Sequence, residues 1–313
     1  MGVAGAGLAK NRELRVGVMV LPELMAVPGV RGKFRDLLAQ HGMVAGTDYT
    51  IVLGMPDESG EFGPPARQLV GDGVDVIIAA GGSASVVAAM QAAPTTPIVM
   101  FAAPDPVGDH LVASLARPGG NVTGVCTFGV ELVTKRLQML MHVLNEPTAI
   151  AFLKLESEFG ARYEVYERAL RDVAGKAGVR MEIVRMRDPA EMEAAFYEIR
   201  QRRVDGVVLD NPARFAGQAK RIGSLALANR LPTIGDAALF SAAGVLMSYG
   251  PDYDYAADRT ADYVVRIWKG AKPRDLPVEL IAKFDLTVNA TTAEALGVTL
   301  PRSVMVIASR IYR

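Results

Sequence analysis

The stretch VDVIIAAGGSASVVAAMQAAPTTPIVMFAA, residues 74–103, decides the fold. Its two apolar runs, 74–80 and 97–102, have the length and continuity of strands that are buried on both faces of a sheet. The segment 84–92 between them predicts a helix. A strand, a helix and a second strand in this order predict a parallel sheet that is covered by helices.

The same alternation continues on both sides of this stretch. It restarts near residue 130, which predicts two similar α/β lobes, each Rossmann-like and built on a parallel sheet. Outside residues 74–103 the expected strands are 14–20, 49–53, 149–153, 181–184, 206–209, 233–234, 244–248 and 284–289. The expected helices are 29–41, 64–72, 131–144, 163–177, 189–201, 216–229, 255–269 and 291–296, the last of them capped by Thr291.

Breaker-rich segments predict where the chain passes from one lobe to the other. The segment RPGGNVTG, residues 117–124, separates the two series of elements, and a second such segment covers 270–277. From the residues alone the late elements could return the chain to either lobe. We expect an N-terminal lobe of residues 14–124 plus about 251–277. The C-terminal lobe would hold residues 125–250 plus about 278–313.

Composition argues against several classes of function. Lysine plus arginine equals aspartate plus glutamate at 34 each, which argues against a nucleic-acid partner. One cysteine, Cys126, and three histidines without ligand spacing give no disulfide and no metal site. Sequence motifs for a nucleophile with its base are missing, so we expect no enzyme and no cofactor. No apolar run approaches the ~20 residues needed to cross a bilayer.

The first ten residues are rich in glycine and alanine and show no intact secretory signal. From these residues alone, a cytoplasmic location and a processed, exported chain both stay open.

Ligands of parallel sheets bind where the strands end, so the loops after the strands carry the candidate residues. In the N-terminal lobe two glycines and two serines follow the run 74–80 and open a helix, which suits a carboxylate or a phosphate. Helix capping is the alternative role for these serines. A rigid loop between two prolines follows the next strand. The candidates here are Gly82, Ser83, Ala84, Ser85 and Asp105, with a local turn as the alternative role for Asp105.

In the C-terminal lobe acidic and amide side chains follow three successive strands. Together they could receive a cationic group such as an α-ammonium, although each type is also common in caps and turns. A tyrosine that follows the expected strand 244–248 could supply an aromatic wall or a hydroxyl. The candidates here are Glu156, Ser157, Asp210, Asn211, Asp236 and Tyr249.

Several segments resemble one known family. They are 79–83, 105–124 (DPVGDHLVASLARPGGNVTG), 246–250 (LMSYG), 269–277 (KGAKPRDLP) and 283–299, which contains FDLTVN and TAEALGVT. They are similar to the substrate-binding proteins of ABC transporters, the family that includes tryptophan- and tyrosine-type binding proteins. The resemblance extends over nearly the whole chain.

The resemblance implies a type I periplasmic-binding-protein fold with two lobes, three crossings and a hinge. It implies a periplasmic or otherwise extracytoplasmic location and delivery of a solute to the membrane permease of an ABC importer. We expect the protein to be a monomer. It also implies that the loop 82–85 grips a carboxylate, and that acidic or amide groups stand at Asp210 and Asn211.

The chain departs from the aromatic amino-acid branch at residues 124–128. These read GVCTF, whereas members of the branch often carry an acid after NVTG, and Phe128 is kept as a candidate ligand residue. Both an amino acid and an aromatic carboxylate without an amine are therefore open as ligands. A ligand-sensing domain of a regulatory system on the same fold is the alternative function.

Overall fold

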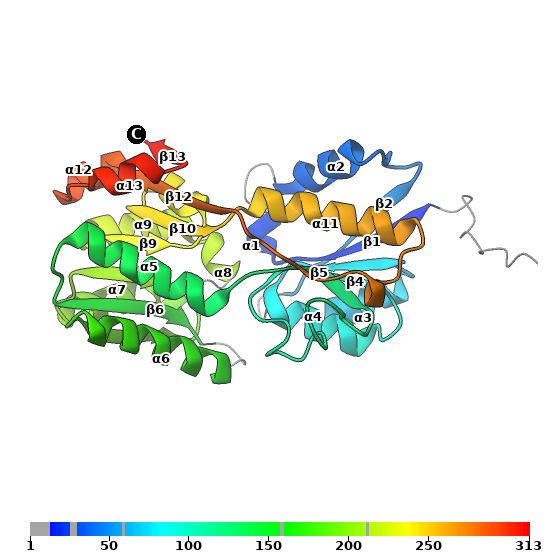
Figure 1. Ribbon diagram of the computed structural model, residues 1–313, viewed down its shortest axis with the longest axis horizontal. Coiled ribbons are helices and arrows are strands. Elements are labelled where there is room, and N and C mark those ends of the chain that lie inside the picture. The colour runs from blue at the N-terminus through cyan, green and yellow to red at the C-terminus, as the bar shows by residue number, and fades with distance from the viewer. Residues whose placement is uncertain (1–12, 26–29, 58–59, 157–159, 211–212) are drawn as a thin grey trace, which may run out of the picture. The chain divides into compact units, whose positions relative to one another are not determined.

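The computed structural model describes residues 13–25, 30–57, 60–156, 160–210 and 213–313. The chain packs into two compact units (Figure 1). Unit 1 holds the residues up to Thr127 together with Tyr253–Ile281, and unit 2 holds Phe128–Asp252 together with Ala282–Arg313. The chain thus changes unit after residues 127, 252 and 281, where the sequence analysis places the changes after 124, 250 and 277.

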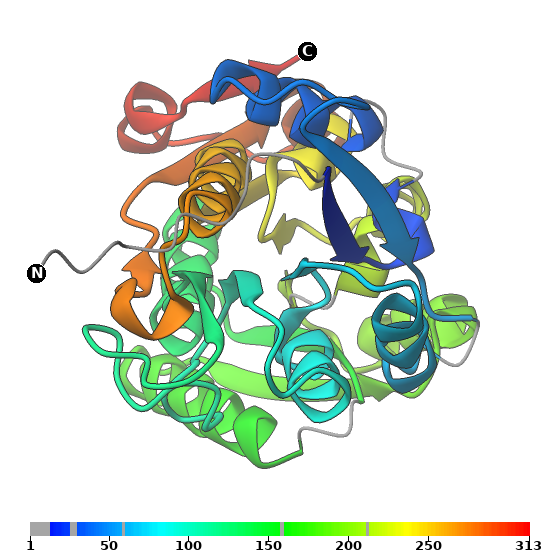
Figure 2. The ribbon, with the colours of Figure 1, turned by 90° about the vertical axis from the view of Figure 1, so that its right-hand side faces the viewer.

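Unit 1 is a six-stranded sheet with the order β11-β5-β4-β3-β1-β2, and every neighbouring pair is parallel. Helices α2 and α11 lie against one face and α3 and α4 against the other, as the orange α11 and the cyan α4 show (Figures 1 and 2). The strands are β1 Leu14–Met19, β2 Tyr49–Gly54, β3 Val76–Ala79, β4 Ile98–Ala103, β5 Val122–Cys126 and β11 Glu279–Leu280. The helices are α1 Pro22–Met25, α2 Val30–Gln40, α3 Gly63–Gly71, α4 Gly82–Ala92, α11 Tyr253–Trp268 and the 3₁₀ turn η2 Pro273–Asp275.

Unit 2 is a seven-stranded sheet with the order β13-β12-β10-β9-β8-β6-β7. Helices α5 and α6 pack together on one face, and α7, α9 and α10 lie on the other. The strands are β6 Ala149–Leu155, β7 Arg180–Met186, β8 Gly206–Leu209, β9 Thr233–Gly235, β10 Met247–Pro251, β12 Phe284–Asn289 and β13 Arg310–Tyr312. The helices are α5 Gly129–Leu144, α6 Gly160–Lys176, the 3₁₀ turn η1 Pro189–Glu191, α7 Met192–Gln201, α8 Ala213–Ala216, α9 Ala219–Ala228, α10 Ala238–Ala242, α12 Ala290–Leu296 and α13 Arg302–Ile307.

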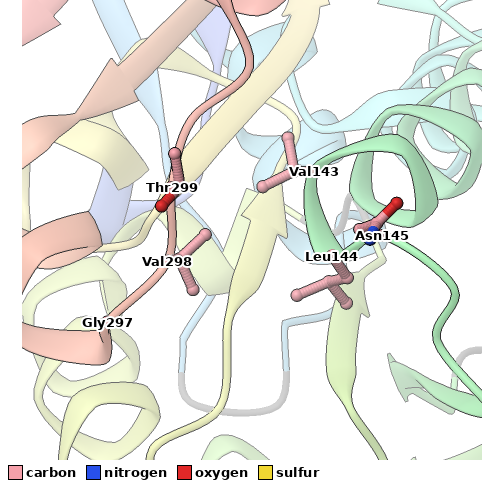
Figure 3. Close-up of a pocket in the computed structure, with 6 residues that line it drawn as sticks. All are labelled: Val143, Leu144, Asn145, Gly297, Val298 and Thr299. Carbon is pink, nitrogen blue, oxygen red and sulfur yellow. The ribbon is translucent and has the colours of Figure 1, made fainter.

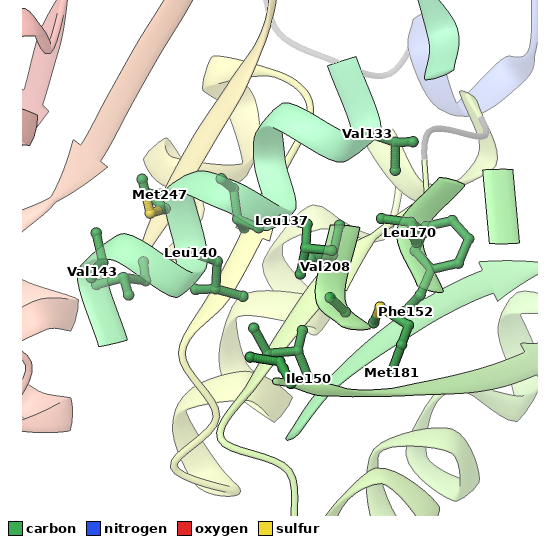
Figure 4. Packing of buried hydrophobic residues seen from close by; sticks show 14 of the residues in the cluster. Val133, Leu137, Leu140, Val143, Ile150, Phe152, Leu170, Met181, Val208 and Met247 are labelled. Carbon is green, nitrogen blue, oxygen red and sulfur yellow. The ribbon is translucent and has the colours of Figure 1, made fainter. Parts of the chain in front are cut away.

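Each unit has its own apolar core. In unit 2 the buried stripe of α5 packs on β8, β9 and β10, and Figure 4 shows Leu137 and Leu140 among the side chains of this core. In unit 1 the strand residues Val76 and Val99 belong to one buried cluster with Val264 of α11. Because the central strands are covered on both faces, they are continuous in apolar residues, which is why the sequence predicts them well.

The α/β class and the parallel sheets are confirmed, with one exception in the second sheet. Strand β12 runs antiparallel to β10, whereas β6 to β10 are mutually parallel. The chain leaves unit 2 after β10 and comes back to it at residue 282. Within unit 2 no crossover helix therefore joins β10 to β12, and the two strands need not be parallel.

Four local predictions were wrong. The breaker-rich segment 117–124 contains the start of a buried strand, β5, whose Gly124 has a φ of +126° and lies against the carbonyl of Met100. The expected helix 216–229 is α9, which begins only at Ala219, because the short helix α8 before it ends at Ala216. The cap of α12 is Asn289, whose side chain accepts a hydrogen bond from the Thr292 N–H, and Thr291 lies inside the helix.

The fourth error bears on the site. The expected strand 244–248 is β10 at Met247–Pro251, so Tyr249 lies within a strand and does not follow one.

Candidate functional site

In both units the parallel strands end at one edge of the sheet, where their loops meet. The described candidates of unit 1 are Gly82, Ser83, Ala84, Ser85 and Asp105, and those of unit 2 are Phe128, Glu156, Asp210, Asp236 and Tyr249. Ser157 and Asn211 lie outside the described residues.

The loop after β3 is a tight turn that leads directly into α4. The helix begins at Gly82, whose φ of +70° favours glycine, so Ser83, Ala84 and Ser85 form its first turn. The Ser85 hydroxyl accepts a hydrogen bond from the Gly81 N–H at 2.9 Å and donates one to the Gly82 carbonyl at 2.8 Å. Because Ser85 is buried and its hydroxyl is used within the turn, it shapes the loop.

Ser83 is buried at the same turn and meets an acid that the sequence analysis missed. Its hydroxyl donates a hydrogen bond to Oδ2 of Asp109 at 2.6 Å. Asp109 belongs to the loop after β4, the strand beside β3, so the topology brings the two loops to one edge. A carboxylate, that of Asp109, therefore lies at the start of α4. It adds a hydrogen-bond acceptor to a turn that the sequence alone predicts to bind an anion.

Asp105 performs the local role that its position between prolines allows. Its Oδ1 accepts a hydrogen bond from the Gly108 N–H at 2.9 Å, and its carbonyl accepts one from the Asp109 N–H at 2.9 Å. It thus fixes the turn that carries Asp109. Burial, and to a lesser degree the charge of Asp105, raise the pKa of the Cys126 thiol to about 12, which keeps this thiol protonated and unreactive at neutral pH.

In unit 2 two acids are buried at the ends of neighbouring central strands. Asp210 follows β8 and is 2% exposed, and Asp236 follows β9 and is 6% exposed. Glu156 follows β6 but is exposed. Of the three acids predicted for this edge, the structure thus buries Asp210 and Asp236 and leaves Glu156 in solvent.

The two aromatic candidates differ in exposure. Phe128 stands at the start of α5 with 42% of its surface exposed. Tyr249 is half-buried in β10 with its ring stacked on Phe284 at 6.0 Å between centroids, and burial raises the pKa of its hydroxyl. The Tyr249 carbonyl accepts a hydrogen bond from Nη1 of Arg136 at 3.4 Å, a buried arginine that the sequence analysis also missed.

A buried ion pair lies next to Glu156 in the chain. Nζ of Lys154 donates a hydrogen bond to Glu167 at 2.8 Å, and Arg185 donates to the same carboxylate at 2.7 Å. Burial alone raises the pKa of Glu167, but the hydrogen bonds and charges of Lys154 and Arg185 outweigh it and lower the pKa. The positive charge of Lys154 is thus balanced by the carboxylate of Glu167 within unit 2.

Two surface depressions lie elsewhere in unit 2. One of about 230 Å³ is lined by Val143, Leu144, Asn145, Gly297, Val298 and Thr299 (Figure 3). Leu144 lies close to Gly206, the first residue of β8, so this depression is at the amino edge of the sheet and away from the candidate residues. The other, of about 260 Å³, lies between the end of β7 and α7.

Within the described part of the chain no group of three or more potential ligands could hold a metal ion. A search of the same residues finds no helix with both the length and the apolar character of a membrane span.

Comparisons with known proteins point to one family. The family model described as ABC transporter substrate binding protein matches residues 56–312. A curated tyrosine-binding protein of Clostridioides difficile (strain R20291) is 25% identical over 231 residues, which are 74% of this chain. The match spans 65% of the length of that relative.

Solved structures share the fold. The ABC domain from Streptococcus pneumonia in complex with L-Trp has a TM-score of 0.83 at 24% identity, over 96% of this chain and 100% of that chain. A conserved domain protein from Vibrio cholerae has a TM-score of 0.84 at 27% identity, also over 96% of this chain and 100% of that one. The fold class expected from the sequence resemblance is thereby confirmed.

Proposed function

Since the chain belongs to the ABC transporter substrate-binding protein family, we propose that it captures a small carboxylate-bearing solute, an amino acid or an aromatic acid, for an ABC importer. The family match over residues 56–312 carries the proposal. The ligand class is supported by two relatives, one named for tyrosine and the other crystallised with L-Trp. Proteins of this kind are extracytoplasmic, and we assign this chain to the same location. We further propose that it is a monomer and that it delivers its solute to a membrane permease.

The proposed ligand residues come from both units. From unit 1 we assign the first turn of α4, at Gly82, Ser83, Ala84 and Ser85, together with the loop after β4 that holds Asp105. From unit 2 we assign Phe128, Glu156, Asp210, Asp236 and Tyr249, together with Ser157 and Asn211, which follow two of the expected strands in the sequence. The buried pair Asp210 and Asp236 would receive the ammonium group of an amino acid.

Solute capture would proceed by hinge closure. A ligand that contacts both units favours the closed form by its differential affinity for that form. The permease would recognise the closed protein, and the solute would leave unaltered, because the protein performs no chemistry on it.

A thermal-shift series tests the ligand class. L-tyrosine and L-tryptophan are compared with 3-(4-hydroxyphenyl)propionate, which lacks the amine, and with tyramine, which lacks the carboxylate. A ligand at 100 times its Kd stabilises the folded state by about 2.7 kcal/mol, which is well resolved as a rise in Tm. A rise with the carboxylates and none with tyramine supports the proposal. No rise with any carboxylate, or turnover of the compound detected by mass spectrometry, contradicts it.

A further inference from the structure

Arg136 of unit 2 is buried at a position of α5 where the helical pattern predicts an apolar side chain. It lies on the buried stripe of α5, one residue before Leu137 and four before Leu140, two residues of the core shown in Figure 4. Its exposed fraction is 2%, and it is the largest fully buried side chain of the described residues. A buried charge is costly unless it is paired and hydrogen-bonded.

The described residues offset little of the cost of burying the charge of Arg136. Its side chain has one hydrogen bond there, from Nη1 to the Tyr249 carbonyl at 3.4 Å, beyond the usual 2.7–3.2 Å range. Within the described residues Nε is buried and has no hydrogen-bond partner. Lys154, the other buried cation of this unit, is by contrast held at 2.8 Å from the Glu167 carboxylate.

Arg136 reaches the edge of the sheet where the candidate residues are. Strand β9 ends at Gly235 and pairs with β10 only through Met247 and Ser248, so the Tyr249 carbonyl lies beyond its last paired residue. There the chain at Asp236 comes close to β10, since a methyl group added at Gly250 would be 1.6 Å from the Asp236 carbonyl oxygen. The guanidinium is therefore bonded to the backbone of one proposed ligand residue, Tyr249, and the next residue, Gly250, lies against the backbone of another, Asp236.

We propose that Arg136 is a ligand-binding residue whose Nε donates a hydrogen bond to a carboxylate oxygen of the solute. This rests on the function proposed above and adds to it an anion-binding group in unit 2. Arginine suits this task because its guanidinium stays charged and its planar donors match a carboxylate. Binding places a counter-charge at a buried cation whose Nε has no hydrogen-bond partner among the described residues, and this attraction offsets the cost of removing the solute carboxylate from water.

The first test measures stability and affinity in parallel. Arg136→Met keeps the apolar stem and removes the charge, Arg136→Lys keeps the charge and removes the planar fork, and Arg171→Met is the control. Arg171 lies in the same unit and also donates to a carbonyl at 3.4 Å, that of Met181, but it is exposed. We expect both Arg136 variants to weaken L-tyrosine binding at least tenfold by calorimetry, or about 1.4 kcal/mol, while Arg171→Met binds as the wild type does.

The ligand-free Tm separates a binding role from a structural one. Removing a buried cation whose Nε has no hydrogen-bond partner among the described residues leaves the Tm of Arg136→Met equal to or above that of the wild type. A lower Tm together with unchanged affinity for L-tyrosine would show that Arg136 serves packing alone, and would overturn the proposal.

A second measurement does not depend on the identity of the solute. The Nε–Hε resonance of Arg136, assigned by its loss in Arg136→Lys, is followed by NMR during titration with acetate and, as a neutral control, acetamide. A shift with acetate alone supports the proposal even if neither L-tyrosine nor L-tryptophan binds, in which case only the proposed ligand class fails. No shift with acetate, with L-tyrosine bound normally by Arg136→Met, overturns the assignment of Arg136 and leaves the proposed function intact.

Discussion

Replacing Asp210 by asparagine should weaken the binding of an amine-bearing solute while the fold is kept. The substitution preserves the size and hydrogen-bonding capacity of the side chain and removes its charge. Asp210 is 2% exposed at the end of β8, a central strand of unit 2, so a bound ammonium group would interact with it in the absence of bulk water. Loss of one partner of a buried charge pair costs about 2–5 kcal/mol, and we therefore expect more than a tenfold loss of affinity for L-tyrosine.

Asp205, at the other end of the same strand, provides the matched control. Its carboxylate accepts hydrogen bonds from the Thr148 N–H at 2.6 Å and the Ala149 N–H at 3.0 Å, so it ties β6 to the loop before β8. Asp205→Asn should lower the Tm and leave the affinity for L-tyrosine unchanged. Asp210→Asn should instead leave the Tm unchanged and lower the affinity for L-tyrosine.

Calorimetry of both variants with L-tyrosine and with 3-(4-hydroxyphenyl)propionate measures the contribution of the amine. The affinity of the amine-free acid should be the same in the wild type and in Asp210→Asn. Wild-type affinity of Asp210→Asn for L-tyrosine would refute the assignment of this carboxylate to the ammonium group.

Three further predictions concern stability. Gly124→Ala should lower the free energy of unfolding by at least about 1–3 kcal/mol in urea titrations, because the new Cβ would lie 2.3 Å from the Met100 carbonyl oxygen at a φ of +126°. Phe152→Ala should cost about 3–5 kcal/mol in the same assay, since the ring is fully buried in β6; a loss below 1 kcal/mol would contradict this packing. The folded-state pKa of Glu167 is lowered by Lys154, so their pair stabilises the protein above the unfolded-state pKa, and this contribution is lost as pH falls through the folded-state pKa. The Tm of Glu167→Gln should therefore differ most from the wild type at neutral pH and converge on it in acid, and a constant difference would exclude this linkage.

The sequence predicts the central strands well and their ends poorly. The runs that became β3, β4, β6 and β8 are apolar throughout, because helices cover both faces of the sheet. Strand β5 is equally buried but contains Thr123 and Gly124, and a glycine there reads as a breaker, although the contact with Met100 requires it. Tyr249 was placed after its strand because the run 244–248 is itself apolar, whereas pairing with β12 extends β10 to Pro251.

The site could be predicted in outline only. Strand ends point to Ser83 and Asp210 as candidates, because the topology of a parallel sheet places all such residues at one edge. Asp109 could not be separated from Asp105, since the fold of the loop decides which acid reaches Ser83. Arg136 could not be found at all, because a charged residue on a helix ordinarily extends its head group into water, and only the packing of α5 shows that it does not.

The most direct test of the central claim is a calorimetric titration of the wild-type protein with L-tyrosine, followed by mass spectrometry of the released compound. The account predicts binding of one molecule per chain with a Kd of about 1 μM or tighter, and recovery of the compound unaltered. Absence of binding by L-tyrosine, L-tryptophan and their amine-free analogues alike, or recovery of a converted product, would contradict a solute-binding role of this kind.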